Sequence, residues 1–160
     1  MDAVRLALYE VEGKGGRKKI RELATEYDRM TLGHEIFPEE CLEFILELLS
    51  TEALFSKAGI DAFLIKLSTD MDKLSVQQKE KLLNVIRNNY CNYSDLELCW
   101  VVGDMVARYY DRKQAMNFFR DVFGSAGKAG KEGVVLGLDV VAKHSGRDAK
   151  VMQDIDNILK

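Results

Sequence analysis

The segment 124–131, GSAGKAGK, has the residue types of a phosphate-binding loop, in which backbone N–H groups and a lysine hold phosphate oxygens. Its spacing does not fit that chemistry. Five residues separate Gly124 from Gly130, and Glu132 stands where a serine or threonine would bind magnesium. No strand is expected before it, and the shorter run 13–16, GKGG, also lacks a strand–helix setting. We therefore predict a flexible hairpin turn at 124–131.

Histidine and cysteine chemistry is the next kind of site to test. Neither His34 nor His144 belongs to a set of ligands at helical spacing that would complete a metal site. The cysteines form no Cys-x-x-Cys pair, so we expect reduced and buried thiols. Cys99 lies in an apolar stretch beside Trp100, which favours a core position over a Cys–His nucleophile. The sequence thus predicts no enzymatic activity, no metal and no cofactor. The three cysteines are Cys41, Cys91 and Cys99.

A basic cluster lies near the N-terminus, and a protein that binds nucleic acid needs such a surface to neutralise phosphates. Acidic residues surround this cluster, however, and residues 1–33 hold seven basic and six acidic side chains. The whole chain has a formal net charge of −3. A solvated helix face therefore explains the cluster better than a nucleic-acid site. The cluster consists of Lys14, Arg17, Lys18, Lys19 and Arg21, among Glu10, Glu12, Glu22 and Glu26.

The segment 34–75 is strongly acidic, with nine acidic and three basic side chains and a net charge of −6. Glu39, Glu43 and Glu47 follow at i, i+4 and i+8, which places them on one exposed stripe of a helix that starts at Pro38. Two interpretations stay open: an ordinary solvated face, or a docking surface for a basic partner. The candidate contact residues in this segment are Glu39, Glu43, Glu47, Asp70 and Asp72.

Four tyrosines lie at or near expected hairpin ends, where a ring can pack against the next repeat while the hydroxyl reaches water. The alternative is an interface anchor, because tyrosine is enriched among the residues that dominate binding energy. These residues are Tyr90, Tyr93, Tyr109 and Tyr110. We add Tyr109 and Tyr110 to the candidate contact residues.

The elements that carry these residues are expected to be helices. From Ser75, a good N-cap, to Asn89, apolar residues cluster on one helical face. Ser94 is expected to cap a second helix over about 95–110, and the two would form an antiparallel hairpin. The expected inner residues are Val76, Leu82, Leu83, Val85 and Ile86, then Leu98, Val102, Met105, Val106 and Tyr109.

The same unit recurs along the chain at steps of 35 to 38 residues. First helices are expected near 38, 76, 112 and 147, and second helices near 59, 95 and 131. At an offset of 35, DMVAR (104–108) lies over DVVAK (139–143), and each run pairs an aspartate with a base four residues later. Repeats of this length, each unable to bury its own apolar face, are typical of an α-solenoid.

We predict one all-α domain over 1–160, built from stacked antiparallel helical hairpins at 34–145. Capping helices at 1–33 would bury Ile20, Leu23, Ala24 and Tyr27, and a capping helix at 146–160 would bury Val151, Met152, Ile155 and Leu159. The single proline suits long helices, and no strand is needed. No apolar run reaches the roughly 18–20 residues that span a bilayer, and no secretory signal is present. We therefore expect a cytoplasmic protein without membrane contact.

The hairpin 75–110 resembles bacterial immunity proteins with HEAT-like repeats, which accompany toxins of contact-dependent growth inhibition and related polymorphic toxin systems. The resemblance rests on Leu96-Glu97-Leu98-Cys99-Trp100 leading into Gly103-Asp104-Met105-Val106-Ala107-Arg108, and it covers about residues 38–145. The proline of the first helix and the aspartate of the turn that are usual in HEAT repeats are missing or displaced. The resemblance implies a short HEAT-like α-solenoid.

It also implies an inhibitor that binds the C-terminal domain of a cognate toxin and covers its active site. Many such toxins are basic nucleases, some of which cleave tRNA, including the EndoU-like type. An acidic surface that imitates a phosphate backbone would suit them. The alternative is a helical-repeat scaffold or adaptor that binds a host protein, which the sequence does not separate from an immunity protein.

Overall fold

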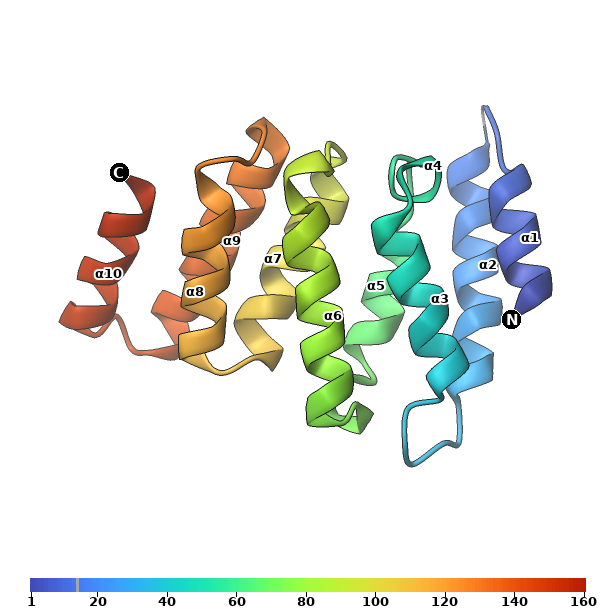
Figure 1. Ribbon diagram of the computed structural model, residues 1–160, viewed down its shortest axis with the longest axis horizontal. Coiled ribbons are helices and arrows are strands. Elements are labelled where there is room, and N and C mark those ends of the chain that lie inside the picture. Colours follow the sequence, from blue (N-terminus) through green and yellow to red (C-terminus); the bar gives the residue numbers. More distant parts are fainter. Residues whose placement is uncertain (14) are drawn as a thin grey trace. The chain divides into compact units, whose positions relative to one another are not determined.

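The computed structural model describes residues 1–13 and 15–160, in which the chain forms ten α-helices, two 3₁₀ helices and no strand (Figure 1). The prediction of an all-α chain is confirmed for these residues. Lys14 of the basic cluster lies outside them. The helices gather into two compact units, Met1–Asn89 and Tyr90–Lys160, which we call unit 1 and unit 2. The sequence analysis predicted one domain over 1–160 and no boundary between Asn89 and Tyr90. The single domain stays a prediction.

Unit 1 holds the N-terminal helices. It contains α1 (Asp2–Glu10), α2 (Gly16–Thr31), α3 (Glu39–Ser50), α4 (Glu52–Phe55), α5 (Asp61–Ser68), η1 (Met71–Lys73) and α6 (Val76–Asn89). Helix α2 packs against α1, α3 and α5, while α3 packs against α4 and α6. The short elements α4 and η1 were not expected from the sequence.

The core of unit 1 is built around three aromatic rings from different helices. The ring centroid of Tyr27 in α2 lies 5.7 Å from that of Phe44 in α3 and 5.8 Å from that of Phe63 in α5. The ring centroids of the two phenylalanines are 5.4 Å apart. Each ring is fully buried. Helix α2 buries Ile20, Leu23, Ala24 and Tyr27, which confirms the face expected from the apolar spacing.

Helix α6 begins with a reciprocal cap. The Ser75 hydroxyl accepts from the Gln78 backbone N–H at 3.1 Å, and the Gln78 side chain accepts from the Ser75 N–H at 3.0 Å, which confirms Ser75 as the N-cap. Gln78 is buried, and its amide group also donates to the carbonyl of Phe37 at 3.2 Å. Gln78 thus takes the inner position of the first turn, and Val76, expected inside, is 74% exposed.

Unit 2 holds the C-terminal helices. It contains η2 (Tyr90–Asn92), α7 (Leu96–Tyr109), α8 (Arg112–Phe123), α9 (Lys128–His144) and α10 (Ala149–Leu159). Helix α9 packs against α7, α8 and α10, and α10 also packs against α8. In Figure 1, α8 and α9 run alongside each other from a shared turn. Helices α6 and α7, expected to form one hairpin, belong to different units.

Two helix starts in unit 2 differ from expectation. Asp95, not Ser94, caps α7, because its carboxylate accepts from the Leu98 backbone N–H at 2.9 Å. Helix α9 begins at Lys128, not near 131, so the turn after α8 covers only 124–127 and the rest of the expected loop is helical. A turn is therefore confirmed at 124–127, and the prediction is wrong for 128–131.

Helices α7 and α9 approach so closely that only glycine fits where they cross. A Cβ on Gly103 would collide with the carbonyl of Gly133, and one on Gly133 would collide with the carbonyl of Cys99. A Cβ on Gly137 would lie 2.8 Å from the carbonyl oxygen of Gly103. Beside this crossing, the buried Tyr90 hydroxyl donates to the carbonyl of Gly130 at 2.7 Å. The two helix backbones are therefore in direct contact.

The repeated run 104–108 and 139–143 behaves as predicted. Asp104 and Arg108 form an ion pair at 2.8 Å, and Asp139 and Lys143 form one at 2.7 Å. The apolar residues at the centre of both runs are buried; they are Met105, Val106, Ala107, Val140, Val141 and Ala142. The prediction for α10 is correct for Val151 and Ile155, but Met152 is only half-buried, and Ile158 is buried in place of Leu159, which is 38% exposed.

Candidate binding surfaces

Helix α3 exposes part of the acidic stripe predicted on it. Glu39 and Glu43 face solvent, and so does Glu40, which the sequence analysis did not select although it lies in the same first turn. Glu39 accepts from the Gln78 side chain at 3.0 Å and lies 3.5 Å from the Lys81 Nζ. The hydrogen bond from Gln78, followed by the charge of Lys81, lowers the pKa of the Glu39 carboxyl.

Glu47, the third member of the stripe, is half-buried and holds α3 to α1. Its carboxylate accepts from the Arg5 Nε at 2.6 Å and from the Tyr9 hydroxyl at 3.0 Å. The hydrogen bond with Glu47 raises the pKa of the Arg5 guanidinium. Because Arg5 neutralises this carboxylate, Glu47 contributes to the packing of unit 1 and offers little charge to a partner.

The two aspartates near η1 differ in exposure. Asp72 faces solvent, whereas Asp70 is only 7% exposed and pairs with the Lys73 Nζ at 2.8 Å. The hydrogen bond with Asp70 raises the pKa of Lys73. Of the five acidic candidates, Glu39, Glu43 and Asp72 are therefore the exposed ones.

The tyrosine candidates lie in unit 2, whereas the acidic candidates lie in unit 1. Tyr109 is half-buried, and Tyr110 is only 6% exposed. Burial raises the pKa of the Tyr110 phenol. Tyr90 and Tyr93 are also buried, with ring centroids 5.8 Å apart. Such rings contribute mainly to packing within unit 2.

The three cysteines differ in their access to solvent. Cys41 and Cys99 are buried, and burial raises the pKa of their thiols to about 11 and about 12. A thiol with such a pKa is protonated at neutral pH and is a weak nucleophile. Cys91 is exposed, so the expectation of buried thiols is wrong for this cysteine, and His34 and His144 are exposed too. The prediction that Cys99 lies in the core is confirmed.

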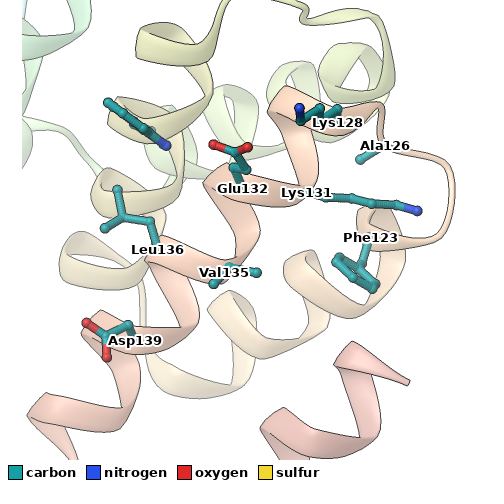
Figure 2. Close-up of a pocket in the computed structure, with 9 residues that line it drawn as sticks. Phe123, Ala126, Lys128, Lys131, Glu132, Val135, Leu136 and Asp139 are labelled. Atoms are coloured by element: carbon teal, nitrogen blue, oxygen red, sulfur yellow. The ribbon is translucent and has the colours of Figure 1, made fainter.

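A groove on unit 2 was missed by the sequence analysis (Figure 2). It has a volume of about 850 Å³ and is lined mainly by apolar atoms. Trp100 from α7, Phe123 from α8, and Val135 and Leu136 from α9 form its apolar part. The available signal was the α9 run Val134-Val135-Leu136, in which three consecutive apolar residues cannot all face the core of a helix pair.

Charged residues from α9 surround the apolar part of this groove. Figure 2 shows Lys131 extended beside Phe123, while Glu132, Leu136 and Asp139 follow one another along the other side of the helix. The Lys131 Nζ lies 5.4 Å from the centre of the Phe123 ring. Lys128, in the first turn of α9, completes the lining.

The described residues thus present two surfaces of different chemistry, namely carboxylates exposed on α3 and an apolar groove beside α9. No described helix is both long enough and apolar enough to cross a membrane. Comparison of the chain with models of protein families, with curated proteins and with solved structures finds no match.

Proposed function

We propose that this protein is a non-enzymatic, cytoplasmic immunity protein. It binds the C-terminal domain of a cognate bacterial toxin and covers its active site. The toxin domain is a basic nuclease, for example a tRNA-cleaving one of the EndoU-like type. The resemblance of the sequence of residues 75–110 to immunity proteins with HEAT-like repeats supports this proposal.

The packing within each unit supports the HEAT-like arrangement that belongs to this proposal. In a stack of helical hairpins, first helices pack on first helices and second helices on second helices. In unit 1, α3 packs on α6 and α2 on α5; in unit 2, α8 packs on α10 and α7 on α9. We propose that each unit is built from HEAT-like repeats.

The main support for a basic partner is the exposed acidic face of α3. Glu40 and Glu43 face solvent and have no ion-pair partner among residues 1–13 and 15–160. Because no neighbouring cation neutralises them, their field extends to an approaching molecule. Such carboxylates attract a basic surface and would compete with the phosphates that a nuclease binds.

Co-purification tests the proposal. The gene that precedes this one would be expressed with a tag on the C-terminal domain of its product, together with the full chain described here. We expect recovery of a 1:1 complex and rescue of cells from the toxicity of that domain. Absence of both the complex and the rescue would discard the immunity function.

Charge reversal then tests the acidic face. We expect the double variant Glu40→Lys, Glu43→Lys to weaken toxin binding by about tenfold or more, since like charges at an interface cost several kcal/mol. Glu26→Lys in α2 is the control and is matched in charge to Glu40→Lys alone, because Glu26 is also exposed and without an ion pair in the described chain. Glu47 is left unchanged, because its loss would break the contact with Arg5. Equal affinities of all variants would rule out α3 as the contact surface.

A scaffold or adaptor that binds a host protein is the second candidate. The apolar groove around Trp100 favours it, because exposed tryptophan and aliphatic side chains suit many protein partners and specify no toxin. Rescue from toxicity separates the two functions, since an adaptor would not protect cells.

A further inference from the structure

The groove of unit 2 exposes three large apolar side chains in one place. Trp100 is 41% exposed, Val135 49% and Leu136 36%. Apolar side chains scattered singly over a surface need no explanation, whereas a contiguous group often marks an interaction site. Tryptophan is also among the residues that most often dominate binding energy. The apolar part of the groove therefore suits the side chain of a partner.

One end of the groove is positively charged. Lys128 and Lys131 lie in the first turn of α9, where the helix dipole adds partial positive charge. The N-cap is Gly127, which has no side chain to accept from the free N–H groups of that turn. Within the described chain, neither lysine has a carboxylate at ion-pair distance, and Lys131 lies over the ring of Phe123 instead. This end can therefore accept a negative group from outside.

The two carboxylates of the groove, Asp139 and Glu132, differ in how strongly they repel a negatively charged ligand. Asp139 lies 2.7 Å from the Lys143 Nζ and 3.8 Å from an Arg147 nitrogen, so one base of α9 and one from the turn after it neutralise Asp139. The hydrogen bond with Lys143 lowers the pKa of Asp139. Glu132 is exposed and has no such partner in the part of the chain described. Glu132 is thus the one carboxylate expected to repel an acidic ligand.

We propose that this groove binds a partner-protein segment that is both apolar and acidic. A large apolar side chain of the segment covers Trp100, Val135 and Leu136, and a carboxylate close to it reaches Lys128 and Lys131. This inference goes beyond the proposed function and does not depend on it. The chemistry is opposite to that of α3, whose exposed carboxylates favour a basic surface.

The groove contains its own reporter, because Trp100 is the single tryptophan of the sequence. The full chain would be titrated with a helical peptide that has leucine on one face and glutamate on the other, and with the same peptide carrying lysine in place of glutamate. We expect the glutamate peptide to shift the Trp100 emission to shorter wavelength and to bind about tenfold more tightly than the lysine peptide. Equal affinities, or no shift with either peptide, would overturn the proposal.

Two variants of the groove are expected to change the affinity for the glutamate peptide in opposite directions. Lys128→Glu with Lys131→Glu should weaken binding of the glutamate peptide about tenfold or more, and Glu132→Gln should strengthen it about twofold to threefold. The matched control is Lys113→Glu with Lys150→Glu, which makes the same change of net charge on α8 and α10 away from the groove. A control that weakens binding as much, or a Glu132→Gln variant that also weakens it, contradicts the proposal.

A second copy of the chain is the competing occupant. Sedimentation at increasing concentration distinguishes it, because the proposal requires a groove that is open in the isolated protein. A dimer that Val135→Glu dissociates would overturn the proposal in favour of self-association. If peptide binding is retained while toxin rescue fails, the immunity function is discarded and the groove assignment stands.

Discussion

The two units bury similar aromatic clusters but hold their helices together in different ways. Unit 1 packs Tyr27, Phe44 and Phe63 with ring centroids 5.4 to 5.8 Å apart. Unit 2 packs Tyr90, Phe118 and Phe119 at 5.4 and 5.5 Å. Edge-to-face contacts occur in both, as expected for buried rings. The difference lies in the contacts around these clusters.

In unit 1, side chains reach across from one element to another. The Arg5 guanidinium pairs with Glu47 of α3, the Lys57 ammonium donates to the carbonyl of Val11 at 2.8 Å, and Lys66 lies 3.8 Å from Asp28. In unit 2, the backbones of α7 and α9 meet directly at glycines, and the ion pairs Asp104–Arg108 and Asp139–Lys143 each lie within one helix. Long side chains can adjust to a change, whereas a contact between two backbones cannot.

The largest effect is expected at the glycine contact. Gly103→Ala places a Cβ against the carbonyl of Gly133, so the two helices must separate. We expect unit 2 to lose about 2–3 kcal/mol of stability, although alanine is the better helix former by about 1 kcal/mol. Urea unfolding monitored by circular dichroism measures this loss.

Gly124→Ala is the matched control for that variant. Gly124 has an ordinary helical conformation, with φ −65° and ψ −32°, and a Cβ there meets no atom within 4 Å. We expect no loss of stability, or a gain of about 0.4–1 kcal/mol from the stiffer unfolded chain. Equal losses for both variants would contradict the close contact between α7 and α9.

Loss of the hydroxyl should affect the free energy of unfolding differently at two buried tyrosines. Tyr90→Phe removes the hydrogen bond to the Gly130 carbonyl, and we expect unit 2 to lose about 1 kcal/mol. The Tyr27 hydroxyl is buried without a partner in the described chain, so Tyr27→Phe should leave the stability of unit 1 unchanged or raise it by about 1 kcal/mol. The free energies of unfolding of both variants decide this. A loss at Tyr27 as large as that at Tyr90 would show that its hydroxyl has a partner.

The smallest effect is expected at the ion pair between α1 and α3. In a double-mutant cycle with Arg5→Gln and Glu47→Gln, we expect a coupling of about 0.5–1 kcal/mol that decreases as salt is added. The pair Asp104 and Arg108 of α7 is the control, with about 0.3–0.5 kcal/mol expected for neighbours on one exposed helix. Zero coupling at low salt would mean that unit 1 does not depend on this contact.

Helix positions were largely predictable from the sequence because they follow from local properties. The apolar spacing of 17–30 correctly predicted four buried residues of α2, and the pairs at Asp104 and Asp139 follow from i, i+4 spacing alone. The error at Ser94 is also local, because Asp95 is an equally good cap and the alternatives differ by one residue.

The candidate site was predicted less well, because charge along a sequence does not show which charges are already paired. Glu39, Glu43 and Glu47 share the spacing of a stripe, yet the half-buried Glu47 is paired with Arg5, 42 residues away. In the same way, Asp70 counts as acidic in the sequence but is buried beside Lys73 in the fold.

The sequence by itself determined the all-α class, the approximate positions of the longer helices, and the apolar face of most of them. These properties depend on side chains within a few residues of each other. Only the tertiary structure decided that Trp100 faces solvent beside Val135 and that Gly103 meets Gly133. Both depend on the distance and rotation at which α7 and α9 pack, and these are set by contacts between residues about 30 to 35 positions apart.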